Sequence, residues 1–456
     1  MTKARNIADL LDANGDVKSA SLDNVPASDD ASALTTGTLP VARLSDGSIT
    51  SAKLNNDAKV VKSGSAPTSP VEGNLWYDTT NEILKVYNDT DSAFVKVVQV
   101  VPTLDSISGS IFNTLAGNLT LTGTGFLSAN LIVSFTPSGG SASTVTVTPT
   151  NDTTSTVAIP TAIYGQAGAT VIAIKVTNSD NKSSGNINKT VIALPTGGTI
   201  TTYGSTRVHT FNSSANFVVA SGFSSSVDTL LVAGGGAGGN WHAGGGGAGG
   251  MFTYTHTPSA GTYSIVIGSG GAGGTTSVGS VGGNTTGFSQ TAIGGGRGGN
   301  YEATAPTSGG SGAGGNGDST YLTGGSGTAG QGNTGGTGVN GHQGGGGGGK
   351  GGNGGGGNGN TNAGNGGIGG TNNYQTGSNQ YYAGGGGGGN WNTSTIAQGG
   401  NGGGGNGSYS GNSGSPTAGT VNTGGGGGGS GSQGNNTSYA SQTTGGSGIV
   451  IIKYLI

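Results

Sequence analysis

The sequence GGGGGGKGGNGGGGNG occupies residues 344–359 and offers almost no side chain that a hydrophobic core could bury. Two further runs of six glycines begin at Gly384 and Gly424, so that the three runs start 40 residues apart. The segment 234–448 holds 87 of the 105 glycines in the 456-residue chain but only four charged residues. A fixed spacing of this kind predicts a repeated structural unit rather than an ordinary globular domain.

Two structures are compatible with the glycine-rich segment, a disordered tract and a packed array of extended glycine helices. Collagen is excluded because glycine does not occupy every third position and proline is scarce. Ordering one glycine costs about 1 to 2 kcal/mol of backbone entropy, so an array requires that nearly every backbone N–H and C=O is paired. Helices of the polyproline II type have outward-facing polar groups, and without side chains they can bond to neighbours on all sides. We predict this polyglycine II array, with its Asn and Ser interruptions at the rim, where side chains have room.

Apolar β-strand patterns frame the glycine-rich segment. The patterns VHTFNSSANFVVA (208–220) and SVDTLLVAGGG (226–236) lie at its start, and GIVIIKYLI (448–456) closes the chain. Such strands must pair their backbone groups with other strands. We therefore expect 234–446 to be a long set of insertions in one small sheet.

The first half of the chain has the composition of a modular β-rich protein. Residues 37–44 (GTLPVARL) and 47–54 (GSITSAKL) form a ten-residue pseudo-repeat that buries too little apolar surface to fold alone. This pattern favours a homotrimer in which the aliphatic positions of three copies meet on one axis, and a flexible linker is the alternative. Residues 73–98 alternate and turn as a small β-meander does, and we expect Trp76 in its core rather than at a sugar-binding surface.

Composition removes several classes of function. The chain has no cysteine and only four scattered histidines, so neither a thiolate site nor a histidine metal site is expected. A net charge of −3 gives no basic surface for nucleic acid. The segment 344–350 is close to a phosphate-binding loop, but Gly351 stands where Ser or Thr is required. Because we find no nucleophile elbow, zinc-protease motif or carboxylate pair, we expect no enzyme activity, no cofactor and no metal.

The large side chains of the glycine-rich half lie between the glycine runs. In an array of helices these connections collect at the two ends, where aromatic residues mixed with Asn, Ser and Thr give a large contact area at low entropy cost. We therefore predict a receptor-binding surface, and the alternative is that the rings only cap the bundle. The candidate receptor-binding residues are Trp241, His242, Tyr301, Tyr321, Tyr374, Tyr381, Tyr382, Trp391, Tyr409 and Tyr439.

Two parts of the chain resemble known families. VPTLDSISGSIFN (101–113), LTLTGTGF (119–126) and AIKVTNSDNKSSG (173–185) resemble immunoglobulin-like domains of the TIG type, which implies a β-sandwich that serves mostly as a spacer. VDTLLVAGGGAGG (227–239) and GGSGIVIIKY (445–454) resemble the glycine-rich domain at the ends of phage fibres, which is related to the polyglycine-sandwich adhesins of T-even-like phages. In those adhesins the loops between helices select the host receptor, and the resemblance implies that role for the ten candidate residues. Those adhesins are usually separate short proteins, whereas here all parts share one chain.

These observations predict a mainly β protein that ends in a β-framed polyglycine II helix bundle. We expect five segments: an N-terminal attachment segment (1–34), a slender shaft-like repeat (35–70), a β-meander (71–100), an Ig-like sandwich (101–195) and the glycine-rich receptor-binding domain (196–456).

The expected function is that of a non-catalytic phage tail fibre protein. Its N-terminal region would contact other virion tail proteins, and its glycine-rich domain would bind a host cell-surface glycan or outer-membrane protein. Because the sequence shows neither a signal peptide nor a membrane span, we expect assembly in the host cytoplasm and a place in the virion. The alternatives are a structural fibre or decoration protein with an inert glycine bundle, a bacterial surface adhesin and a depolymerase.

Overall fold

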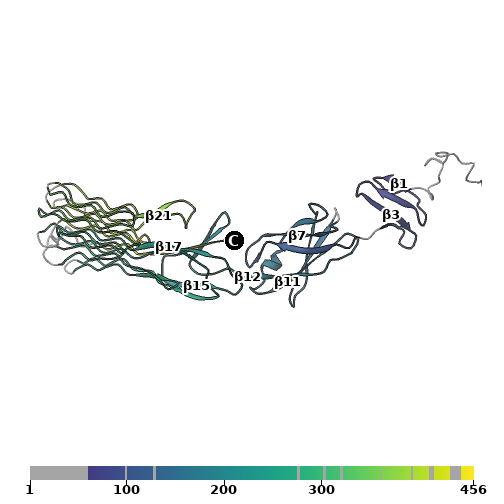
Figure 1. Cartoon of the computed structure of the whole chain (residues 1–456), viewed down its shortest axis with the longest axis horizontal. Helices are drawn as coiled ribbons and strands as arrows, with labels where there is room; N and C mark the ends of the chain where they lie inside the picture. The colour runs from purple at the N-terminus through teal and green to yellow at the C-terminus, as the bar shows by residue number, and fades with distance from the viewer. Residues whose placement is uncertain are drawn as a thin grey trace, which may run out of the picture. The chain divides into compact units, whose positions relative to one another are not determined.

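The computed structural model of the chain is mainly β (Figure 1). It describes residues 60–97, 100–126, 130–274, 278–300, 304–318, 322–359, 361–391, 394–409, 415–431 and 443–456. The expected attachment segment and the pseudo-repeat of the shaft lie outside these residues. The chain divides into two compact units, one ending at Val100 and the other beginning at Val101. Over the described ranges, no helix has the length and apolar character needed to cross a membrane.

The first unit contains a four-stranded sheet in the order β1-β2-β3-β4. Its strands are β1 (Val60–Ser63), β2 (Leu75–Asp78), β3 (Ile83–Asn88) and β4 (Ala93–Lys96). The last three form the predicted meander, and β1 adds a parallel strand beside β2 that the sequence pattern did not indicate. Trp76 is buried: its Nε1 donates to the carbonyl of Ser63 at 3.0 Å, and its ring meets Phe94 edge-on. The expected core role of Trp76 is confirmed.

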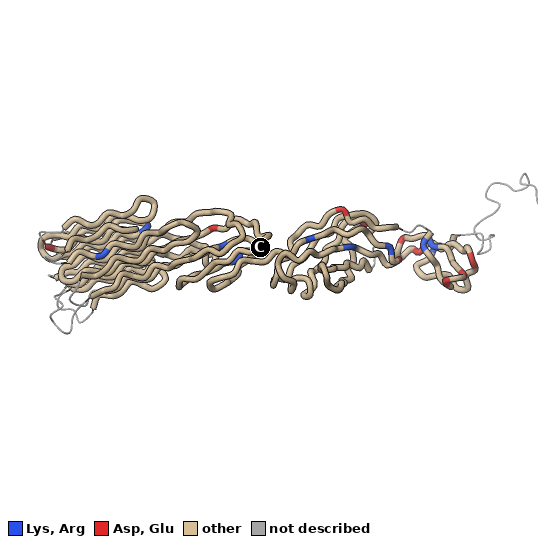
Figure 2. The backbone as a smooth tube through the Cα atoms, turned by 90° about the horizontal axis from the view of Figure 1, so that it is seen from below, with Lys and Arg blue, Asp and Glu red and all other residues tan. Residues whose placement is uncertain are grey.

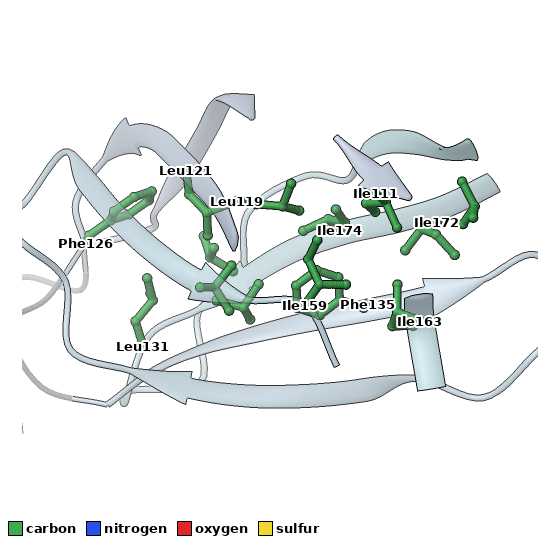
Figure 3. Close-up of a cluster of buried hydrophobic side chains, with 14 residues drawn as sticks. Ile111, Leu119, Leu121, Phe126, Leu131, Phe135, Ile159, Ile163, Ile172 and Ile174 are labelled. Carbon is green, nitrogen blue, oxygen red and sulfur yellow. The ribbon is translucent and has the colours of Figure 1, made fainter. Parts of the chain in front are cut away.

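The second unit begins with a β-sandwich of two sheets, which confirms the predicted Ig-like architecture. One sheet has the order β10-β7-β5 and the other β6-β12-β11-β8-β9. Alternate side chains of β7 and β11 point inward. The side chains of Leu121 in β7, Phe135 in β8 and Ile174 in β11 are fully buried between the sheets (Figure 3). The elements are β5 (Thr103–Ser108), β6 (Ile111–Phe112), β7 (Asn118–Thr124), β8 (Leu131–Pro137), β9 (Ser143–Val147), β10 (Thr154–Ala158), α2 (Thr161–Tyr164), β11 (Val171–Thr177) and β12 (Ile187–Ile192).

A five-stranded sheet, which we call the β frame, supports the glycine-rich segment. Its order is β13-β14-β23-β16-β17, with β13 (Thr199–Tyr203), β14 (Thr206–Phe211), β16 (Val227–Val232), β17 (Met251–His256) and β23 (Ile449–Leu455). The last strand of the chain is thus central, antiparallel to both β14 and β16. Because both faces of β23 are covered, its sequence is a nearly unbroken apolar run. This confirms that the glycine-rich segment is inserted into one small sheet.

Three two-stranded hairpins or ribbons accompany the β frame. They pair β15 (Ala215–Val219) with β18 (Gly261–Ile265), β19 (Thr285–Gly287) with β20 (Gln290–Ala292), and β21 (Gly370–Asn372) with β22 (Gln380–Tyr382).

The glycine-rich segment forms the predicted array of extended helices. In the helix 243–250, every third residue donates to the same neighbouring segment, as expected for three residues per turn. The bonds run from Gly244 and Gly247 to Gly299 and Gly296, from Gly245 and Ala248 to Gly345 and Gly348, and from Gly246 and Gly249 to Gly427 and Gly424. Their N···O distances are 2.8–3.1 Å. Hydrogen bonds to three neighbours, rather than buried hydrocarbon, therefore hold the array together, and Figure 2 shows how few charged residues lie on it.

Candidate functional site

The array has two ends with different surroundings. Its frame end adjoins β16, β17 and β23, and its free end lies at the other end of the helices (Figure 1). The helix 234–239 continues from β16, turns at 240–242 and returns as 243–250 into β17. At this free end, the N–H of Trp391 donates to the carbonyl of His342 at 3.1 Å, and Gly317 bonds both His242 and His342 through its backbone. Backbone hydrogen bonds therefore hold the turns of the free end in contact with one another.

Beneath these turns lies a layer of buried amide and hydroxyl side chains, which we call the polar layer. The side-chain oxygen of Asn300 accepts the N–H of Asn240 at 2.9 Å, and Asn316 donates to the carbonyl of Asn300 at 2.7 Å. Asn390 donates in the same way to the carbonyl of Thr361 at 3.0 Å. The members, all buried, are Asn300, Asn316, Gln343, Asn390, Ser408 and Ser430. The expectation that Asn and Ser face the rim is wrong for these residues, because backbone groups at the ends of the helices need buried partners.

Four rings from three turns meet above the polar layer, and we call them the ring cluster. The His242 ring is central: its centroid lies 5.3 Å from that of Trp241, 4.2 Å from that of His342 and 5.1 Å from that of Trp391. His242 is only 3% exposed, whereas Trp391 is 39% exposed. The cluster thus has a fixed base and an outward-facing indole.

The two histidines are joined through their rings. The Nδ1 atoms of His242 and His342 lie 3.0 Å apart, so that one donates a hydrogen bond and the other accepts it. Burial lowers the pKa of His242 to about 3, with a further contribution from His342 and an opposing one from Asp318. At neutral pH, His242 is therefore an uncharged and rigidly placed ring.

The turns of the ring cluster hold three non-glycine residues in the left-handed backbone region. Their φ angles are 62° for Trp241, 47° for His242 and 76° for His342. Each such residue costs about 1 to 3 kcal/mol, and strained residues of this kind gather at functional sites. The free end therefore keeps a ring arrangement that local backbone preference opposes.

One protein family, described as a glycine-rich domain, has a sequence model that matches residues 210–455. The match runs from β14 to the end of β23 and covers more than half of the 456 residues. The chain belongs to the glycine-rich domain family. The whole array and the strands β16, β17 and β23 of the β frame therefore lie within the matched region, whereas β13 and most of β14 precede it. The ring cluster lies at the free end of this matched array.

Other comparisons add little to this assignment. The solved structures that are similar to the chain include the crystal structure of the chicken CNTN1 FN1–FN3 domains, at 11% identity. That similarity covers 41% of this chain and 69% of the other, and its TM-score of 0.17 supports no argument about fold. No curated protein matches the chain significantly.

Not every candidate aromatic residue of the glycine-rich domain belongs to the ring cluster. Tyr409, half-buried, pairs with Asn390 through a backbone bridge and so lies at the free end. Tyr301, Tyr321 and Tyr439 lie outside the described residues. His342, by contrast, belongs to the cluster although it was not among the candidates, because nothing in its local sequence marks it as a neighbour of His242.

Three candidate tyrosines lie instead at the frame end, in the β21–β22 hairpin. Tyr382 is 3% exposed and packs into the apolar core of the frame, where burial raises its pKa to about 12. Tyr374 packs against the same core, with the ammonium of Lys453 at 4.4 Å from its ring centroid. The sequence predicted these tyrosines in receptor-binding connections between glycine runs. In the structure, Tyr374 and Tyr382 instead cover an apolar face of the β frame. Only Tyr381 of the three is exposed, at 45%.

Two kinds of site are in question for the glycine-rich domain, a metal site and a phosphate-binding loop. Within the ranges that the structure describes, no three metal-ligating side chains come together. Residues 344–349 form an array helix, and the Lys350 ammonium donates to the carbonyl of Gly330 at 2.6 Å, so this segment is not a phosphate-binding loop. The ring cluster offers stacking surfaces and hydrogen-bonding nitrogens in a fixed arrangement.

Proposed function

We propose that this protein is a phage tail fibre component that binds a host surface receptor through the free end of its glycine-rich domain. The observation that carries this proposal is the ring cluster, in which His242 anchors the exposed indole of Trp391 above the buried polar layer. Such an arrangement is already in place before binding, and preorganised aromatic surfaces lose little entropy when a partner docks. The receptor would be a cell-surface glycan or an outer-membrane protein.

The rest of the chain would serve attachment and reach. The Ig-like sandwich acts as a spacer in this proposal, and the N-terminal region joins three copies and contacts other tail proteins in the virion. Glycine-rich domains are not a typical enzyme family, which supports binding without catalysis. A catalytic fibre would instead release reducing sugar from host envelopes, and we expect none.

Two exposed aromatic residues at opposite ends of the array provide the test. Trp391 at the free end is 39% exposed and Tyr381 at the frame end is 45% exposed, so truncating either removes a similar surface ring. We expect Trp391→Ala to weaken binding of the purified, labelled full chain to intact host cells by about thirtyfold, the effect of losing a binding hot spot of about 2 kcal/mol. Tyr381→Ala is expected to bind as the wild type does.

Flow cytometry with several candidate hosts measures both variants, and circular dichroism checks their folding. Equal binding by both folded variants and the wild type would favour the inert structural bundle. Loss on Tyr381→Ala alone would move the receptor site to the frame end and contradict the proposal.

A further inference from the structure

A groove of about 450 Å³ lies beside the β frame, apart from the ring cluster. It is lined by the end of β17 and the loop that follows, by β18, and by the turn between β19 and β20. Three half-buried rings, His256, Tyr263 and Phe288, contribute to it together with exposed hydroxyl residues such as Ser259 and Thr262. Its size suits one small ligand unit rather than a protein segment.

Phe288 links the rings of this groove to the interior. Its ring centroid lies 4.3 Å from that of His256, 4.7 Å from that of Tyr263 and 5.6 Å from that of Phe217, which is fully buried. The hydroxyl of Tyr263 donates to the carbonyl of Ser259 at 2.9 Å, which ties the loop to the ring. The rings therefore form a firm apolar surface against the core.

The turn that presents Phe288 is strained. Phe288 and Ser289 are the two central residues between the paired Gly287 and Gln290, with φ angles of 52° and 63°. Two-residue turns with both φ angles positive normally use Asn-Gly, and a bulky aromatic residue in this region is an outlier. An aromatic ring thus occupies a turn position where local backbone preference favours asparagine or glycine.

His256 contributes a neutral ring next to Phe288. Both of its ring nitrogens are buried and neither has a hydrogen-bond partner in the protein. Burial lowers the pKa of His256, so that its ring is neutral at pH 7. Because these nitrogens are closed off from solvent, His256 contributes the face of its ring to the groove rather than a hydrogen bond.

We propose that this groove binds a neutral pyranose unit of a glycan, at a site separate from the ring cluster. A pyranose has a face of C–H groups that packs on aromatic rings and a perimeter of hydroxyls that pair with the Ser and Thr side chains lining the groove. No Asp, Glu, Lys or Arg lines the groove, so a charged sugar finds no counter-ion there. The inference does not depend on receptor binding by the free end.

Saturation-transfer NMR on the purified full chain tests this site. The probes are the methyl α-pyranosides of glucose, galactose and mannose, with glucuronic acid as the charged comparison. We expect saturable binding of at least one neutral probe, with a dissociation constant on the order of 1 mM. Phe288→Leu, which keeps apolar volume and removes the ring, should weaken it about three- to tenfold.

Two further variants separate the outcomes. Thr262→Val keeps β18 and removes one hydroxyl, so it is expected to weaken binding about threefold even if Phe288→Leu folds poorly. Trp391→Leu at the free end is expected to leave sugar binding unchanged. No saturation by any neutral probe, or equal affinity in the wild type and both groove variants, would overturn the proposal. Loss of sugar binding on Trp391→Leu alone would also overturn it, by assigning the sugar to the free end.

Discussion

Replacing Gly246 with alanine tests the array directly, because this glycine faces backbone on a neighbouring helix. An added methyl carbon would lie 2.8 Å from the carbonyl oxygen of Ala237 and closer still to that of Gly236. Ordinary contact needs well over 3 Å, so one helix must move by roughly 1 Å. That movement breaks or stretches the bonds from Gly246 to Gly427 and from Gly386 to Gly246, which are 2.8 and 2.9 Å long.

The expected loss of stability follows from these contacts. Overpacking costs about 1 to 3 kcal/mol, and one or two buried backbone groups without partners add about 1 to 3 kcal/mol each. A total of about 2 to 9 kcal/mol corresponds to a drop of roughly 4 to 35 °C in the melting temperature of a domain of this size. Scanning calorimetry of the full chain measures the shift.

A matched substitution removes the effect of residue type. An added methyl at Gly352 would meet only Ile368 Cγ2, at 3.4 Å, which is an ordinary contact. We therefore expect Gly352→Ala to melt at the wild-type temperature or slightly above it, since alanine lowers the entropy of the unfolded chain. If Gly246→Ala also melted with the wild type, the helices would have to lie farther apart in solution than the structure places them, and the reasoning would fail.

Two further predictions concern the free end. Asn316→Ala should lower the free energy of unfolding by about 1 to 3 kcal/mol in urea, because it leaves the carbonyl of Asn300 without its buried donor. Truncation of the exposed Asn379 in Asn379→Ala serves as the control, and equal losses would contradict a special role for the polar layer. His242 has a folded pKa of about 3 against an ordinary value of 6.5, so the unfolded chain binds the extra proton between these values. Stability is therefore full above pH 6.5 and declines as the pH falls toward 3. His242→Gln should flatten this decline in denaturation curves between pH 7 and 4, while His209, whose pKa is lowered to about 4, keeps its own share; an unchanged slope would show that His242 does not contribute.

Much of the fold could be predicted from sequence because the decisive signals are regular. The 40-residue spacing of glycine runs and the apolar strands at either side predicted an array inserted in one sheet. The structure contains both the array and the sheet that frames it. The parallel strand β1 had no such signal, since its four residues have no strong alternation of their own.

The candidate site was harder to predict because it depends on which connections meet in space. Tyr382 precedes the six-glycine run 384–389 and Trp391 follows it, yet Tyr382 is buried at the frame end and Trp391 is exposed at the free end. As a polar residue among glycines, Asn316 is expected at the surface, and only the structure shows that it is buried and donates to the carbonyl of Asn300. The turn at Phe288 could not be predicted, because it lacks the glycine or asparagine that usually marks such a turn in a sequence.

The backbone-filled interior of the array affects how its stability varies with temperature. Unfolding a hydrocarbon core raises the heat capacity, whereas exposing peptide groups lowers it. A domain whose interior is mostly hydrogen-bonded glycine therefore has a small heat-capacity change for its length, and its free energy of unfolding follows a broad, shallow curve. Because the apolar contribution to cold denaturation is also small, the array keeps its structure over a wide range of temperatures, including those at which hydrophobic cores weaken.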